Sequence, residues 1–277
     1  MKMAVKSLTG SRQQRGFTLV ELSVVLVVVG LLFAAVVKGQ EVIDSAKSQK
    51  LINDIKSTEA LIQKYAQLKS RMPGDCDADG VIDFTADSSV SRTDVDNNGR
   101  ALQYDYSTSQ KTYASTPALT LVNEGCAQIA GTAKPSASTS DLVGANTWLN
   151  DLKLAGLVSD SVPNRTFAKQ VNEDFLFVGS VTDGSGSSAD GAKYNAIVVQ
   201  NVPQWMARQV ATAINGTDAN SNRGRVRQLV KTGSTTGTYS ELWSSIGSGT
   251  AGTQDVMRDA MVSVVYFFDR IPATTTN

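Results

Sequence analysis

The chain of 277 residues contains no histidine. Histidine is the commonest general base in enzymes and a frequent zinc ligand, so its absence excludes every catalytic triad and every zinc site that needs an imidazole. A pair of carboxylates could still catalyse a reaction, but no pairing of acidic residues stands above the background of ordinary surface acids. We therefore expect that the protein is not an enzyme.

Cysteine is also scarce, since the chain has only Cys76 and Cys126. No neighbouring residue marks either thiol as a nucleophile. Two cysteines are consistent with one disulfide formed in an oxidising compartment. The pair therefore predicts a bridge in an exported domain.

The chain has no net charge, because 26 basic residues balance 26 acidic ones. The first 16 residues hold four basic residues and no acidic one, so the rest of the chain has a net charge of −4. A nucleic-acid footprint would therefore have to be a local patch, and the sequence contains no strong signal for one.

An apolar segment runs from Phe17 to Val37, and Glu21 is its single charged residue. As a helix it would reach about 31 Å at about 1.5 Å per residue, which is enough to cross the hydrocarbon core of a bilayer. An ionised side chain inside such a span costs roughly 2.5–3.5 kcal/mol on insertion scales. We therefore expect Glu21 to be retained for a cationic partner or a function.

The basic residues before this span predict its orientation. By the positive-inside rule, Lys2, Lys6, Arg12 and Arg15 keep the N-terminus cytoplasmic, so the chain would cross the inner membrane once and place its head in the periplasm. A secretory signal would end its apolar core at a small residue, whereas here Gly16 precedes the apolar run. Cleavage after Gly16 would leave the span on the mature chain.

The stretch RGFTLVELSVVLVVVGLL, residues 15–32, resembles the N-terminus of type IV pilins and type II secretion pseudopilins. The resemblance implies that a prepilin peptidase cuts between Gly16 and Phe17 and methylates the new amine. It also implies that Glu21 pairs with the N-terminal amine of a neighbouring subunit during filament assembly. Other pilin or pseudopilin subunits, the peptidase and the inner membrane are then the expected partners.

The same resemblance implies an α+β, type IV pilin-like fold, with a long N-terminal helix packed on an antiparallel β-sheet head with loop insertions. We divide the chain into a leader (1–16), a membrane and assembly half of the helix (17–37), an amphipathic half (38–70) and a head (71–277). The amphipathic half is indicated by apolar residues at helical spacing, which are Leu51, Ile55, Ile62 and Tyr65. One helix is therefore expected from about Phe17 to Ser70.

The head begins with an acidic stretch, residues 75–105, which contains eight aspartates. Its first part follows the pattern D-x-D-x-D-G of loops that wrap oxygen ligands around Ca²⁺. The candidate ligands are Asp75, Asp77, Asp79 and Asp83. The twelfth position is Ala86, so the usual bidentate acid is missing there, and Asp87 could substitute for it in an irregular loop.

A second copy of the pattern follows. Its candidate ligands are Asp94, Asp96, Asn98, the backbone carbonyl of Arg100, and Asp105 at the twelfth position. For both copies the alternative is a solvated turn, because Asp and Asn favour turns without any metal. We expect calcium at one loop or at both.

The rest of the head predicts a mixed domain. Helices are expected over 147–158 and from Pro203, strands over 174–181, 194–202, 225–231 and 260–271, and surface loops over 131–140, 183–191 and 232–253. Trp148, Trp205 and the cluster 266–268 are expected in the core, since each lies in an apolar periodic segment.

Two functions fit these features. The first is a minor pilin or pseudopilin, a structural subunit of a type IV pilus or type II secretion filament with a calcium-binding head. The second is a binding module at a filament tip that contacts a surface, a secreted substrate or DNA. The resemblance places either one in the inner membrane first and then in a pilus or pseudopilus, which can reach the cell surface.

Overall fold

A computed structural model describes residues 18–86, 125–126, 145–172, 174–182, 192–216, 223–232, 235–239, 243 and 260–272. The expected processing residues, Gly16 and Phe17, lie outside these ranges. So does the second acidic pattern, from Asp94 to Asp105. The chain forms two compact units, Met1–Ser45 and Ala46–Asn277, which are described here separately.

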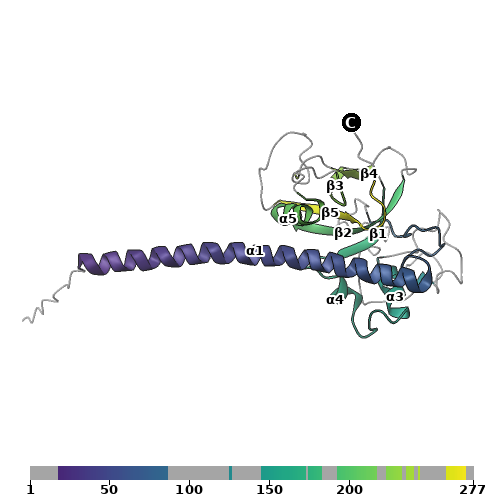
Figure 1. Ribbon diagram of the computed structural model, residues 1–277, viewed down its shortest axis with the longest axis horizontal. Helices are drawn as coiled ribbons and strands as arrows, with labels where there is room; N and C mark the ends of the chain where they lie inside the picture. Colours follow the sequence, from purple (N-terminus) through teal and green to yellow (C-terminus); the bar gives the residue numbers. More distant parts are fainter. Residues whose placement is uncertain are drawn as a thin grey trace, which may run out of the picture. The chain divides into compact units, whose positions relative to one another are not determined.

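Helix α1 covers Leu19–Lys69 and belongs to both units (Figure 1). In the first unit its apolar residues are exposed along the whole segment, as expected for a helix whose surroundings are lipid or other subunits. Among the described residues, α1 is the helix that is long and apolar enough to cross a membrane. The sequence predicted this helix to within two residues at its N-terminus and one at its C-terminus.

In the second unit α1 is amphipathic. Its buried residues recur every three or four positions, and they are Ser48, Leu51, Ile55, Thr58, Ile62 and Tyr65. A polar contact joins this face to the last strand, since the Tyr266 hydroxyl donates to Glu59 Oε2 at 2.8 Å. The ammonium of Lys56 lies 4.6 Å from the centre of the Tyr266 ring. The helix is thus held to the sheet by apolar packing and by one half-buried polar cluster.

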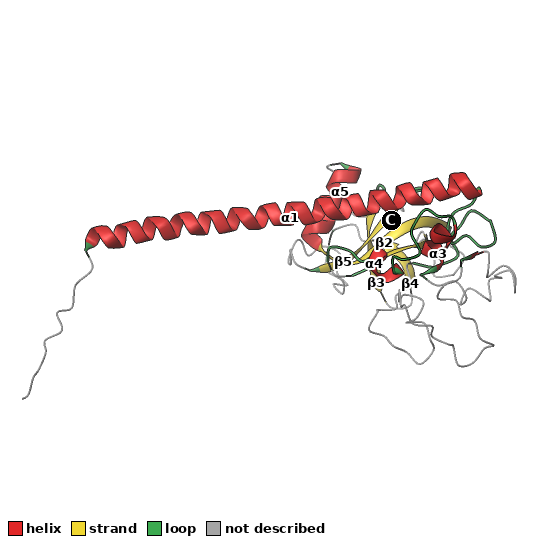
Figure 2. Ribbon diagram, turned by 90° about the horizontal axis from the view of Figure 1, so that it is seen from below, coloured by secondary structure: helices red, strands yellow, loops and turns green. Residues whose placement is uncertain are grey.

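The head is built on a five-stranded antiparallel sheet in the order β1-β2-β5-β3-β4. Figure 2 distinguishes these strands from the helices around them. The strands are β1 (Leu176–Thr182), β2 (Lys193–Pro203), β3 (Val226–Thr232), β4 (Thr235–Tyr239) and β5 (Met261–Phe267). Among the described residues, the head also contains the helices α3 (Thr147–Leu154), α4 (Asn164–Ala168) and α5 (Gln204–Asn215). These elements confirm the expected α+β fold.

The sheet's central strands are buried on both of their faces. Five consecutive residues of β2, 195–199, are buried, and so are six consecutive residues of β5. Helix α5 packs against β2, β3 and β5. The predicted core residue Trp148 is buried, as is the cluster 266–268, while Trp205 is partly buried against the same core.

One expected loop is wrong. Residues 232–253 were predicted as a surface loop, but they contain strand β4, which pairs with β3, and the buried Trp243. Four of the five residues of β4 are threonine or tyrosine, which favour strands. The Gly, Ser and Thr content of the segment is typical of a loop, so composition did not indicate this strand. Pairing with β3 stabilises it.

Candidate functional site

Glu21 forms a local hydrogen-bonded cap at the start of α1. The backbone N–H and the hydroxyl of Thr18 both donate to Glu21 Oε2 at 2.9 Å, and the Glu21 N–H donates back to Thr18 Oγ1 at 3.3 Å. This reciprocal pair is a capping box, in which two otherwise unpaired helix donors are satisfied. The carboxylate therefore has partners within its own chain. The T-x-x-E spacing of residues 18–21 carried this signal, although our interpretation of the sequence did not use it.

The acidic loop, residues 75–83, follows the end of α1 and closes on itself. The N–H of Asp83 donates to the Gly74 carbonyl at 3.1 Å. Gly80 has a φ of 89°, a left-handed conformation that favours glycine, and its N–H donates to Asp75 Oδ2 at 3.1 Å. The Cys76 N–H donates to Asp83 Oδ2 at 2.7 Å. The backbone is thus wound around the carboxylates that the sequence singled out.

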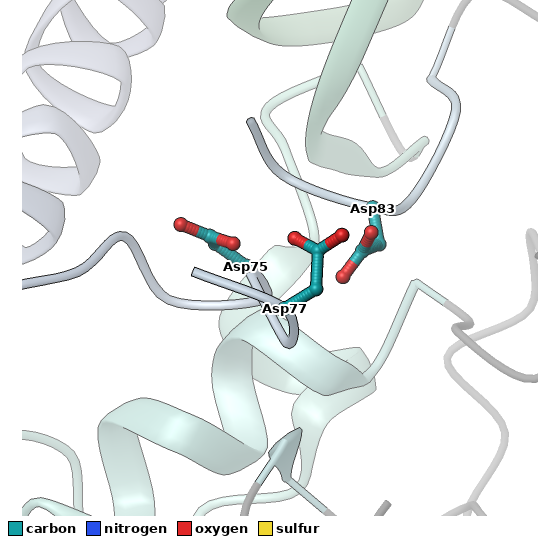
Figure 3. A group of neighbouring side chains, drawn as sticks. All are labelled: Asp75, Asp77 and Asp83. Atoms are coloured by element: carbon teal, nitrogen blue, oxygen red, sulfur yellow. The ribbon is translucent and has the colours of Figure 1, made fainter. Parts of the chain in front are cut away.

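Three of the four predicted carboxylates come together. One oxygen from each of Asp75, Asp77 and Asp83 lies within 4.8 Å of the others, and Figure 3 shows the three side chains gathered at the loop. The fourth, Asp79, is not in this group, and its Oδ1 accepts the Val81 N–H at 2.7 Å. Among the described residues, this group has the oxygen donors that a hard cation prefers.

The group also contains a buried oxygen without a hydrogen-bond partner and carboxylates that repel one another. Asp75 is only 1% exposed, and its Oδ1 has no hydrogen-bond partner. Burial raises the pKa of Asp75, and neighbouring carboxylates raise it further. Burial likewise raises the pKa of Asp83 to about 6, with a smaller contribution from the repulsion of Asp77. A cation at this position would relieve both the repulsion and the cost of the buried oxygen.

The disulfide passes through the same loop. Cys76, which lies between Asp75 and Asp77, is bonded to Cys126, as the cysteine pair predicted, and the two Cα atoms are 4.7 Å apart. Burial keeps this part of the loop away from bulk water, since Cys76 is 8% exposed and Cys126 is fully buried. Any movement of the acidic loop is therefore limited by the bridge.

A buried carboxylate on α3 holds the backbone near both cysteines of the bridge. Asp151 is 2% exposed and accepts the N–H groups of Gly74 and Cys126, both at 2.9 Å. Burial raises the pKa of Asp151, and these two hydrogen bonds oppose that rise. The Arg71 guanidinium lies 3.8 Å from the carboxylate and also donates to the Asp75 carbonyl at 2.9 Å. The sequence carried no sign of this role for Asp151, because its partners lie far away in the chain.

Comparison with known proteins places one family signature at the N-terminus. A family model described as the prokaryotic N-terminal methylation motif matches residues 11–37. The matched segment includes Gly16, Phe17 and Glu21. No curated protein and no solved structure matches the chain.

Proposed function

We propose that this chain, whose N-terminal methylation motif and long apolar helix fit a type IV pilin or pseudopilin, is a minor subunit of such a filament. The motif supports the pilin or pseudopilin part of this proposal. It implies a structural subunit that a prepilin peptidase processes and that assembles with other pilin subunits. The apolar first half of α1 fits a membrane-anchored pilin.

The minor role is supported by the size of the head. The second unit of the chain, Ala46–Asn277, contains the head. It includes long stretches of chain between α1 and α3 and between β4 and β5. In a helical filament every subunit repeats the same contacts, so added bulk on a head is more easily accommodated at sparse positions or at an end. The four basic residues before the span support a cytoplasmic N-terminus and a periplasmic head.

Purified filaments test this proposal. In cells that contain the peptidase, mass spectrometry should find the chain without residues 1–16 and with one added methyl group, in far fewer copies than the main subunit. Glu21→Ala should still enter the membrane, because it removes a costly carboxylate from the span, but it should be depleted from the filament fraction.

Glu41→Ala is the matched control, because Glu41 is an exposed acid on the same helix that pairs with Lys38. It should enter filaments as the wild type does. An intact Met1 in these cells, or normal incorporation of Glu21→Ala, would contradict the proposed role.

The proposal includes Ca²⁺ as a ligand of the acidic loop. Asp75, Asp77 and Asp83 supply carboxylate oxygens, and the unpartnered oxygen of Asp75 is buried beside two further acids. A divalent ion would neutralise the like charges, and Ca²⁺ tolerates the irregular geometry of such loops better than Mg²⁺ does. In the filament, the ion would stiffen the start of the head next to the end of α1.

Calorimetric titration of the full chain in detergent tests this part. Extracellular calcium modules bind at about 10⁻⁴–10⁻³ M, and a free concentration tenfold above Kd should stabilise the fold by roughly 1.4 kcal/mol per site. Asp75→Asn should remove one bound ion, whereas Asp160→Asn, at an exposed position, should not. If Ca²⁺ produces no binding heat and no change in melting temperature, the acidic loop is a solvated turn.

A further inference from the structure

The side chain of Asn195 contacts the acidic loop from the middle of the sheet. Asn195 lies on β2, is fully buried, and belongs to a run of residues covered on both faces. Its Oδ1 accepts the Ile82 N–H at 2.8 Å, and its Nδ2 donates to the Gly80 carbonyl at 2.8 Å. A third contact, at 3.3 Å, joins Nδ2 to Asp269 beyond β5. All of the amide's main donor and acceptor directions are thus used.

These contacts enclose one position of the loop. Gly80 and Ile82 are the two neighbours of Val81, which is seventh in the D-x-D-x-D-G pattern. In loops of this pattern the seventh residue supplies a backbone carbonyl to the ion. Ile82 also directly precedes Asp83, one of the three clustered carboxylates. The amide of Asn195 therefore fixes the backbone on both sides of an expected ligand.

The residue paired with Asn195 holds the next part of the chain. Ser180 on β1 lies opposite Asn195 in the sheet. Its N–H donates to the Phe84 carbonyl at 2.7 Å, and its carbonyl accepts the Ala86 N–H at 2.9 Å. One cross-strand pair thus anchors the loop at residues 80–82 through a side chain and at residues 84–86 through the backbone.

We propose that Asn195 positions the acidic loop. Its side chain holds the loop preformed for Ca²⁺ and couples ion binding to strand β2. This inference rests on the calcium part of the proposed function. Clustered carboxylates repel one another, so a loop without this clamp would spread and would have to be ordered again when the ion binds. Holding the loop in its bound form beforehand removes that cost from the affinity.

Asn215 provides a matched control, because its amide makes the same kind of clamp elsewhere. Its Oδ1 accepts the N–H groups of Arg225 and Val226, and its Nδ2 donates to the Val226 carbonyl at 2.8 Å. No clustered acid lies in that turn, residues 223–226. Substitution of either asparagine removes several hydrogen bonds to the backbone, but only one of them concerns the acidic loop.

The test is calcium titration of the full chain in detergent, with the wild type, Asn195→Ala and Asn215→Ala compared below the melting temperature of each. Asn195→Ala should weaken Ca²⁺ binding at this loop by at least about tenfold, which corresponds to ~1.4 kcal/mol. Asn215→Ala should lower the melting temperature without Ca²⁺ and leave the Kd within about twofold of wild type. A role confined to stability would not separate the two variants in this way.

If Asn195→Ala does not fold, Asn195→Thr replaces it, since a β-branched side chain suits a strand and its short hydroxyl cannot reach both Gly80 and Ile82. A folded Asn195 variant with wild-type affinity would overturn the inference alone. Equal losses of affinity in the Asn195 and Asn215 variants would also overturn it. A wild-type chain that binds no Ca²⁺ would overturn the calcium proposal and this inference together.

Discussion

The surroundings of the Asp83 carboxyl group disfavour its ionised form. Burial raises its pKa to about 6 from an ordinary value of 3.8, and the charges of Asp77 and Asp75 act in the same direction. The hydrogen bond from the Cys76 N–H opposes this rise only in part. The folded state therefore keeps a proton at this position over a range of pH in which the unfolded chain has lost it.

Without Ca²⁺, this proton should make stability depend on pH. The contribution of Asp83 is fully present below the unfolded pKa of 3.8 and is lost as the pH rises through about 6. The melting temperature of the full chain in a chelator should therefore fall between about pH 4 and about pH 7. Added Ca²⁺ should restore stability at the upper end of this range, because it replaces the lost proton as the neutralising charge.

Asp83→Asn identifies the residue responsible. Its amide oxygen can still accept the Cys76 N–H, but the side chain carries no charge, so the chelator-treated variant should be more stable than wild type near neutral pH and should depend less on pH. Asp160→Asn, at an exposed position, should keep the wild-type slope. Identical slopes for wild type and Asp83→Asn would show that this carboxylate has no such role.

At the level of elements, strand β1 and the chain segment 84–86 approach unusually closely. A Cβ atom added at Gly179 would lie 2.3 Å from the Phe84 carbonyl oxygen and 2.8 Å from Phe84 Cδ1. The backbone there is ordinary strand, so the glycine is needed for space and not for an unusual φ. The segment that follows the acidic loop can therefore lie on β1 only because residue 179 has no side chain.

Gly179→Ala should push this segment away from β1. The close contact is with backbone, which cannot rotate away as a side chain can, so we expect a loss of about 1–3 kcal/mol of stability, as for overpacked cores. Ca²⁺ binding should weaken as well, because residues 84–86 directly follow Asp83. Denaturant unfolding and calcium titration of the full chain would measure both effects.

Gly39→Ala is the control for this change, since nothing lies within 4 Å of a Cβ added there. Alanine suits a helix better than glycine, so this variant should leave the stability of the head against denaturant unchanged or slightly higher. Wild-type stability of Gly179→Ala would mean that the 84–86 segment moves without cost.

At the scale of the whole molecule, the disulfide and the acidic loop share the start of the head. The Cys76–Cys126 bridge closes a loop with a sequence separation of 50 residues. Cys76 lies between two acids of the cluster, Asp75 and Asp77. Asp151 accepts backbone N–H groups near both cysteines. The bridge therefore restricts the unfolded chain and at the same time keeps the acidic loop in place.

Loss of the bridge should reduce both stability and ion binding. The loop-entropy account gives about 4 kcal/mol for a closed loop of this length, so the double variant Cys76→Ser with Cys126→Ser should unfold at clearly lower denaturant concentration. Its Ca²⁺ affinity should fall too, because Asp75 and Asp77 flank Cys76. Treatment of the wild type with a dithiol, which reduces the bridge as it is itself oxidised, should reproduce both changes.

Unchanged unfolding of the double serine variant would show that the bridge does not support the head. Lower stability with unchanged Ca²⁺ affinity would instead separate the bridge from the ion site. The two readouts are therefore measured on the same samples.

The amino-acid sequence by itself determined the features that depend on neighbours along the chain. The long helix follows from an apolar run and a helical spacing of apolar residues. The acidic loop follows from aspartates at alternate positions before Gly80, and the strands of the central sheet from short apolar segments. These patterns act over a few residues, which is the range over which backbone geometry repeats.

Tertiary structure decided which distant groups complete the site. Asn195 lies more than a hundred positions beyond the loop it clamps, and Asp151 lies 77 positions beyond Gly74. The space required at Gly179 exists only because segment 84–86 packs there. Strand β4 likewise depends on its pairing with β3. No local pattern encodes these contacts, because hydrogen bonding and close packing between distant segments arise only once the chain has folded.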